Sequence, residues 1–175
     1  MSGYDLVRFF DGSTGWIWAA PQSQIYPMLR RMEQAGLIAG DEEARGPRLT
    51  RTVYSVTEKG HRELTSWLGV AHDAAPPRDP FMVQALNFDM IPAGEAVEVL
   101  EAFIAEQEKA AAEAEAHRDR LLRKETALLK ERLSRRDPED HDRIARLKAH
   151  VFDGIAAVAR TRVEWARKGQ RLLGE

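Results

Sequence analysis

SQIYPMLRRMEQAGLI, residues 23–38, has the apolar spacing of a helix and an unusual polar side. Ile25, Leu29 and Met32 recur at i, i+4 and i+7, which predicts one buried face. The opposite side carries Gln24, Tyr26, Pro27, Arg30 and Arg31. On the helix alone, a solvated face is the better interpretation, and a helix that lies in a DNA groove is the alternative. The flanking sequence has to decide between the two.

Both ends of this helix carry recognisable signals. Ser23, or a residue just before it, is expected to be the N-cap, and Pro27 is tolerated if it lies near the first turn. Gly36 occupies the place where a left-handed residue ends a helix, and Leu37 is then expected to pack on Met32.

The flanks predict a helix on each side and a β-hairpin. A short helix is expected after Ser2, with Leu6, Phe9 and Phe10 as its apolar side chains. Residues 37–57, LIAGDEEARGPRLTRTVYSVT, contain two extended stretches around a Gly-Pro turn. Thr57 is expected to cap a further helix, whose apolar stripe is Leu64, Trp67 and Leu68.

The composition restricts the class of protein. The chain has 175 residues, 43% of them apolar, a net charge of −2 and a pI of about 6.2. Affinity for nucleic acid must therefore come from a local basic patch. There is no cysteine, which fits a reducing compartment, and no apolar run is long enough to span a membrane. No signal peptide is apparent at the N-terminus, so we expect a cytoplasmic protein.

Residues 71–80, AHDAAPPRDP, mark the strongest change in composition. Three prolines forbid a continuous helix there, so we interpret the stretch as a linker. The predicted domains are residues 1–70, the linker 71–80, and a helical domain over residues 81–175.

The helical domain is expected to contain one short helix and two long ones. Residues 81–90 form the short helix, Pro92 begins the next, and SRRDPEDHD (134–142) separates it from the last. The apolar side chains of the first long helix are Val97, Leu100, Ile104, Ala111, Ala114, Leu121 and Leu128. Those of the second are Ile144, Leu147, Val151, Ile155, Val158 and Trp165. Two antiparallel helices with one stripe each cannot close a core, so a second pair is required.

The order helix, helix, hairpin, helix is that of a winged helix-turn-helix. Residues 23–38 would then contain the helix that enters the major groove. The hairpin tip carries Arg45, Arg48 and Arg51 with no acid among them, and arginine binds phosphate bidentately and suits a narrow minor groove. The basic clusters thus fall on the two elements that would face DNA.

The chain resembles the PadR family of transcriptional regulators. The resemblance rests on MSGYDL (1–6), SQIYPMLRRMEQAGLI (23–38), RTVYSVTEKGHRELTSWL (51–68) and the long helical tail. The tail is similar to that of the longer-tailed, virulence-activator-like subfamily. The resemblance implies a homodimer joined through its C-terminal helices, a palindromic operator in double-stranded DNA, and control by a small aromatic or hydrophobic effector.

One departure from the family pattern concerns the start of the chain. Relatives usually have an apolar helix before the Ser-Gly-Tyr-Asp turn, whereas this sequence begins with Met1 inside that turn. We expect something to replace that helix. The favoured candidate is an upstream segment lost to a misplaced start codon, and the alternative is residues 81–90 of the same or a partner chain.

Other kinds of site have little support. Trp16 and Trp18 are expected in the core, with a ligand pocket as the alternative, and Trp67 and Trp165 in the core or a dimer interface. The histidines are scattered, and the acidic turn DPEDHD lacks the glycine of a calcium loop, so no metal or cofactor is expected. No catalytic motif is present, so we do not expect an enzyme.

The sequence therefore predicts a mainly α protein with a small β-hairpin: a winged helix-turn-helix that apparently lacks its first helix, followed by long antiparallel dimerisation helices. Its function is predicted to be that of a dimeric, sequence-specific transcriptional regulator, most simply a repressor. The predicted DNA-binding residues are Ser23, Gln24, Tyr26, Arg30, Arg45, Arg48 and Arg51. The alternative is a helical small-molecule-binding or protein-interaction dimer that no longer binds DNA.

Overall fold

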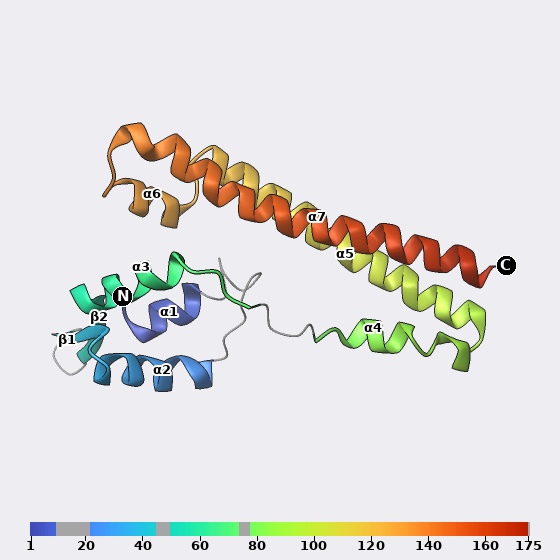
Figure 1. The fold of residues 1–175 in the computed structure, drawn as a ribbon, viewed down its shortest axis with the longest axis horizontal. Helices are drawn as coiled ribbons and strands as arrows, with labels where there is room; N and C mark the ends of the chain where they lie inside the picture. Colours follow the sequence, from blue (N-terminus) through green and yellow to red (C-terminus); the bar gives the residue numbers. More distant parts are fainter. Residues whose placement is uncertain (10–21, 45–49, 74–77, 175) are drawn as a thin grey trace. The chain divides into compact units, whose positions relative to one another are not determined.

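The computed structural model describes residues 1–9, 22–44, 50–73 and 78–174 (Figure 1). The chain divides into unit 1, Met1–Pro76, and unit 2, Pro77–Glu175. Unit 1 contains α1 (Gly3–Phe9), α2 (Gln22–Gln34), β1 (Ile38–Ala44), β2 (Thr50–Val56) and α3 (Glu58–Leu68). Unit 2 contains α4 (Pro80–Ala85), η2 (Phe88–Met90), α5 (Ala93–Leu122), α6 (Ala127–Leu133), η3 (Pro138–Asp140) and α7 (His141–Leu173). Among the described helices, none has the length and apolar character needed to cross a membrane.

A reciprocal cap begins α1. The backbone N–H of Asp5 donates to Ser2 Oγ over 3.2 Å, and the backbone N–H of Ser2 donates to Asp5 Oδ2 over 3.0 Å. The Ser2 hydroxyl also donates to Asp5 Oδ2 over 2.7 Å. These bonds, from the hydroxyl first and the backbone second, lower the pKa of Asp5 below its ordinary value. Ser2 is thus the cap that the sequence predicts, and Asp5 completes a capping box.

Acid is expected to weaken this cap. The folded chain depresses the pKa of Asp5, so the ionised carboxylate stabilises the folded state. This stabilisation is fully present above the ordinary pKa of 3.8 and is lost as the pH falls through the depressed pKa. The melting temperature of Asp5→Asn should therefore depend less steeply on pH than that of the wild type at strongly acidic pH. Thermal melts of both proteins from neutral to acidic pH measure this, and parallel curves would contradict the prediction.

The core of unit 1 is built on α2. Ile25 and Leu29 are buried with Ile38 of β1, as the apolar spacing predicts. Gly36 has a φ of 68°, and the Leu37 N–H donates to the carbonyl of Met32 over 2.9 Å, which is the predicted helix end.

The position predicted for Pro27 is wrong, and the roles predicted for four aromatic residues remain predictions. The helix α2 begins at Gln22, so Pro27 lies past the first turn and not near it. A proline there leaves the carbonyl of Ser23 without its helical N–H partner. The side chains of Phe9 and Phe10 and the whole of Trp16 and Trp18 lie outside the described residues, as does the core or pocket role expected for them.

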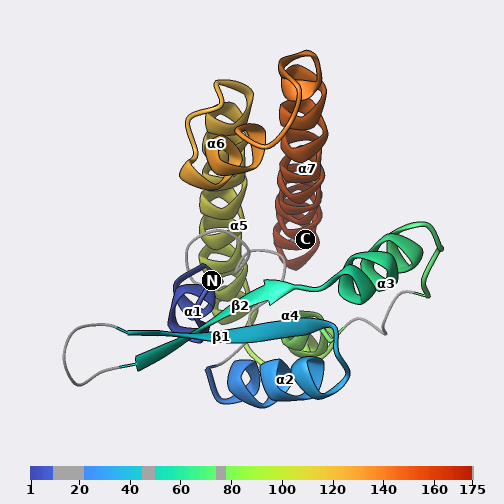
Figure 2. The ribbon, with the colours of Figure 1, turned by 90° about the vertical axis from the view of Figure 1, so that its left-hand side faces the viewer.

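The hairpin is antiparallel, and β1 and β2 lie side by side in Figure 2. Its register pairs Ile38 with Val56, Gly40 with Tyr54 and Glu43 with Arg51. The start of the chain adds to the outer edge of β2, because Met1 and Tyr54 exchange two backbone hydrogen bonds of 2.9 Å.

Thr57 caps α3 as predicted, accepting from the Gly60 N–H over 3.0 Å. The predicted stripe of Leu64, Trp67 and Leu68 lies on one side of α3, but these side chains are 49%, 56% and 66% exposed. A core position for Trp67 within this chain is therefore wrong, and its ring stacks on His72 with centroids 4.8 Å apart.

In unit 2, α5 and α7 run side by side in opposite directions, as Figures 1 and 2 show. The buried residues of α7 are mostly small: Ala145, Ala149, Phe152, Ala156, Ala159, Val163 and Ala166. Most of the apolar stripe predicted for this helix lies on an adjacent, more exposed face. The core between the two helices is therefore built mainly from alanine and not from the large residues of that stripe.

Two predicted helices are interrupted. The long helix expected to reach residue 128 ends at Leu122, and Leu128 belongs to the separate helix α6. The helix expected over residues 81–90 is split into α4 and η2. Phe81 stacks on Phe103 of α5 with centroids 3.6 Å apart, and Trp165 meets both rings edge-on. Phe81 is thus engaged within unit 2.

Candidate nucleic-acid interface

The outer side of α2 is a continuous polar face. Ser23, Pro27, Arg30 and Gln34 recur at helical spacing and are exposed, opposite the buried Ile25 and Leu29. Gln24 and Arg31 border this row on one side and Tyr26 on the other. Of the predicted residues, the structure therefore brings Ser23, Gln24, Tyr26 and Arg30 to the exposed surface of one helix.

Tyr26 is held in place by α1. A Cβ atom built on Gly3 would lie 2.7 Å from Tyr26 Cε1, so the ring rests directly on the backbone of that glycine. The Tyr26 side chain is still 39% exposed. An aromatic ring fixed on one side by packing, with a hydroxyl at its end, is suited to contacting a sugar or a phosphate.

The hairpin tip is described only in part. Arg45 and Arg48 lie outside the described residues, and Arg51 is the first arginine beyond the tip that can be placed. Arg51 faces Glu43 across the two strands, with an ion pair of 2.8 Å and a second bond from Nε over 3.1 Å. The hydrogen bond from Arg51 to Glu43 raises the pKa of Arg51 above its already high ordinary value.

Glu43 is the residue that sequence reasoning missed. The tip reads as basic because no acid lies among the three arginines, yet the register places Glu43 directly opposite Arg51. Asp41 and Glu42 are also exposed on β1. The acidic run DEE next to a predicted two-strand turn is the signal that could have found it, since residues that face each other across an antiparallel pair interact.

No metal centre competes with this face within the described residues. Across residues 1–9, 22–44, 50–73 and 78–174, no three His, Cys, Asp or Glu side chains are grouped so as to hold a metal ion. What unit 1 offers is hydrogen-bond donors on one helix and a partly neutralised arginine beside it.

Comparison with known proteins relates the first 66 residues to a family. The family described as "Transcriptional regulator PadR-like family" matches residues 1–66. The "Negative transcriptional regulator PadR" of Bacillus subtilis (strain 168) is 36% identical over 87 residues, which are 49% of this chain and 47% of that protein. The match therefore spans about half the length of that relative.

The solved structures of similar fold cover almost the whole chain. B. subtilis PadR in complex with operator DNA superposes with a TM-score of 0.72 at 23% identity, covering 99% of this chain and 91% of that one. The same protein in complex with p-coumaric acid superposes with a TM-score of 0.68 at 22% identity, covering 100% of this chain and 91% of that one.

The Vibrio cholerae virulence activator AphA gives a TM-score of 0.62 at 22% identity, with coverages of 99% and 89%. These likenesses establish the fold, a winged helix-turn-helix with long C-terminal helices. The family match shows that residues 1–66 belong to the PadR-like family of transcriptional regulators.

Proposed function

We propose that this chain is a cytoplasmic, homodimeric repressor that binds a palindromic operator in double-stranded DNA. The observation that carries the proposal is the exposed polar face of α2 on a winged lobe of the PadR-like family. Repression is the simplest mode, because a dimer bound at a promoter blocks it without further partners. B. subtilis PadR, which is named a negative regulator, supports this choice.

In this proposal, α2 enters the major groove and the hairpin lies along the backbone. Arg30 and Gln24 are the side chains suited to base edges, since arginine pairs with guanine and glutamine with adenine. Ser23 and Tyr26 contact the groove walls. Arg45, Arg48 and Arg51 anchor the hairpin on phosphate or in the minor groove, with Arg51 exchanging Glu43 for DNA.

The direct test is binding of the intact chain to the DNA upstream of its own gene. A gel shift with that fragment, against an unrelated fragment of equal length, should show specific retention that weakens steeply with salt. Arg30→Ala should cost about 1–3 kcal/mol and relax the base preference at one position. Retention of neither fragment would favour the alternative, a helical dimer that no longer binds DNA, and equal retention of both would contradict sequence-specific binding.

The ion pair in the hairpin gives a second prediction. Glu43→Gln removes the partner of Arg51, so DNA affinity should rise for all sequences alike, and the slope of log K against log salt should steepen by about 0.9 for one added phosphate contact. Alanine at Arg45, Arg48 and Arg51 together should make the slope shallower, by about 0.9 for each phosphate that the hairpin no longer neutralises. Fluorescence anisotropy at several salt concentrations measures both. A salt slope that neither variant changes would remove the hairpin from the interface.

A small aromatic or hydrophobic effector is the proposed control. B. subtilis PadR has been solved in complex with p-coumaric acid, which supports ligands of this class. Adding p-coumaric acid to the complex of this chain with its operator should release the DNA at a saturable concentration. Release by benzoate at the same concentration would show that the acid acts without specificity.

The exposed face of α7 supports the homodimer. Val151, Val158, Trp165 and Leu172 recur every seven residues, and their side chains are 48%, 61%, 38% and 71% exposed. Apolar residues at this interval are typical of the seam of a coiled coil. We therefore propose that this seam packs on a second copy of the chain.

A further inference from the structure

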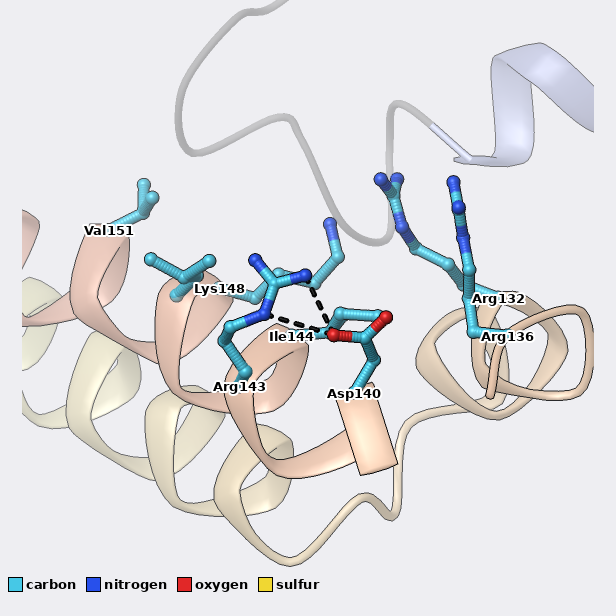
Figure 3. A pocket seen from close by; sticks show the side chains of 8 residues that line it. Arg132, Arg136, Asp140, Arg143, Ile144, Lys148 and Val151 are labelled. Carbon is cyan, nitrogen blue, oxygen red and sulfur yellow. Dashed lines mark hydrogen bonds and ion pairs between the residues drawn. The ribbon is translucent and has the colours of Figure 1, made fainter. Parts of the chain in front are cut away.

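A basic hollow lies where α6 and the turn after it meet the first turns of α7 (Figure 3). Its volume is about 410 Å³. Arg132 and Arg136 stand side by side on one wall, and Lys148 rises from α7 opposite them. All of these residues belong to unit 2, so the hollow is formed within one compact part of the chain.

The positive charge of the hollow is largely uncompensated. Arg143 is neutralised by Asp140, to which it donates from Nε over 3.0 Å and from Nη2 over 2.8 Å. Across the described part of the chain, no carboxylate lies within ion-pair distance of the side chains of Arg132, Arg136 or Lys148. Three cations thus face one space, and the carboxylate beside them is already engaged by a fourth.

Lys148 is the most buried of the three cations. Its side chain is half-buried, and this burial, followed by the nearby charge of Arg132, lowers its pKa below the ordinary value. An ammonium group that is both desolvated and repelled gains more from a nearby anion than a solvated surface lysine does. The planar guanidinium groups beside it bind the oxygen atoms of carboxylate or phosphate bidentately.

The floor of the hollow is apolar. It is formed by Ile144, Leu147 and Val151, and the last two side chains are 59% and 48% exposed. The phosphates of DNA are densely charged and offer little apolar surface to cover such a floor. A small molecule with an anionic head and an apolar body fits both halves of the lining.

We propose that this hollow binds a small amphipathic anion. Its phosphate or carboxylate head lies between Arg132, Arg136 and Lys148, and its apolar body lies on Leu147 and Val151. The site lies in unit 2, whereas the residues predicted to bind DNA lie in unit 1. Because Val151 also belongs to the apolar seam of α7, the ligand would lie at the end of that seam.

Isothermal titration calorimetry of the intact chain tests the site with three probes: octyl phosphate, octanoate and inorganic phosphate. One of the two amphipathic probes should bind saturably, once per chain, and more tightly than inorganic phosphate. The better of the two identifies the head group as phosphate or carboxylate. In Arg132→Gln/Arg136→Gln the affinity should fall by about ten-fold or more, because two charge-assisted hydrogen bonds are removed.

A matched control is the double variant Arg123→Gln/Arg135→Gln. It removes the same charge from the same end of unit 2, but these arginines pair with Glu125 and Glu131 outside the hollow. Its affinity should stay within about two-fold of wild type, since long-range attraction between solvated charges is screened by salt.

Binding should also take up protons at alkaline pH, because the anion raises the pKa of Lys148, and Lys148→Met should abolish that uptake. No saturable heat with either amphipathic probe, or an equal loss of affinity in both double variants, would overturn the proposal. An Arg132→Gln/Arg136→Gln protein that binds DNA more weakly but both amphipathic probes as tightly as wild type would overturn it too. A monomeric protein would contradict the proposed dimer without affecting this result.

Discussion

Replacing Gly60 with alanine is expected to lower the free energy of unfolding of unit 1 by about 3 kcal/mol or more, the upper range for an overpacked core site. A Cβ atom at this position would lie 2.0 Å from the carbonyl oxygen of Leu37 and 2.9 Å from Val56 Cγ1. The first of these atoms is backbone, and it also accepts the Thr57 N–H over 3.1 Å. It cannot move away without breaking the junction between β1 and α3.

This expectation opposes helix propensity. In the interior of an exposed helix, glycine to alanine stabilises by about 1 kcal/mol, and Gly154→Ala in α7 should behave in this way because nothing beyond its own helix turn lies within 4 Å of its new Cβ. Urea denaturation followed by circular dichroism compares the two variants with the wild type. If Gly60→Ala unfolds at the wild-type urea concentration, the close approach of α3 to β1 does not constrain the lobe.

A helix end can be predicted from the sequence when the terminal residue is one that favours helix ends, such as glycine. An end at an ordinary residue cannot be predicted in this way. Gly36 and Lys124 both have positive φ, 68° and 58°, and both end a helix with the same pair of backbone bonds. The end at the glycine can be predicted because only glycine adopts this conformation without cost. Lys124 carries no such signal, so the sequence pattern runs on from α5 into the residues that form α6.

The face of α7 that packs on α5 could not be predicted from the sequence for a different reason. The predicted stripe on α7 consists of large apolar residues, whereas the residues that meet α5 are mainly alanines such as Ala149 and Ala156. Alanine is common on every face of a helix because of its propensity, so its burial leaves little pattern in a sequence. The predicted stripe is apolar, but most of it faces away from the core of its own chain.

In the candidate DNA-binding site, too, some features could be predicted from the sequence and others could not. The outward position of Arg30 follows from helical spacing alone, because a residue opposite Ile25 and Leu29 has to be exposed. The pairing of Arg51 with Glu43 depends on the strand register, which is set by the turn between them. A one-residue slip would place Arg51 beside a different residue. The number of arginines in the hairpin therefore does not predict which of them remain unpaired and available to DNA.

Introducing a charge into the seam of α7 is expected to have the largest effect on DNA binding. Val158→Glu places a carboxylate in the middle of the proposed interface between two copies, where an unpaired charge is strongly unfavourable. The protein should become monomeric at micromolar concentration. Its operator affinity should fall by about 10²-fold or more, because the two half-sites are then bound independently.

The variant should still fold, since Val158 is 61% exposed in the single chain and contributes little to its core. Ala157→Glu is the matched control, because the adjacent residue is also exposed but lies on the polar side of α7. Sedimentation equilibrium gives the oligomeric state, and a gel shift gives the affinity. Two recognition helices can reach half-sites about 34–36 Å apart only if the long helices hold them together. A dimeric Val158→Glu with undiminished affinity would therefore move the interface to another face, and a monomeric wild type would contradict the assembly itself.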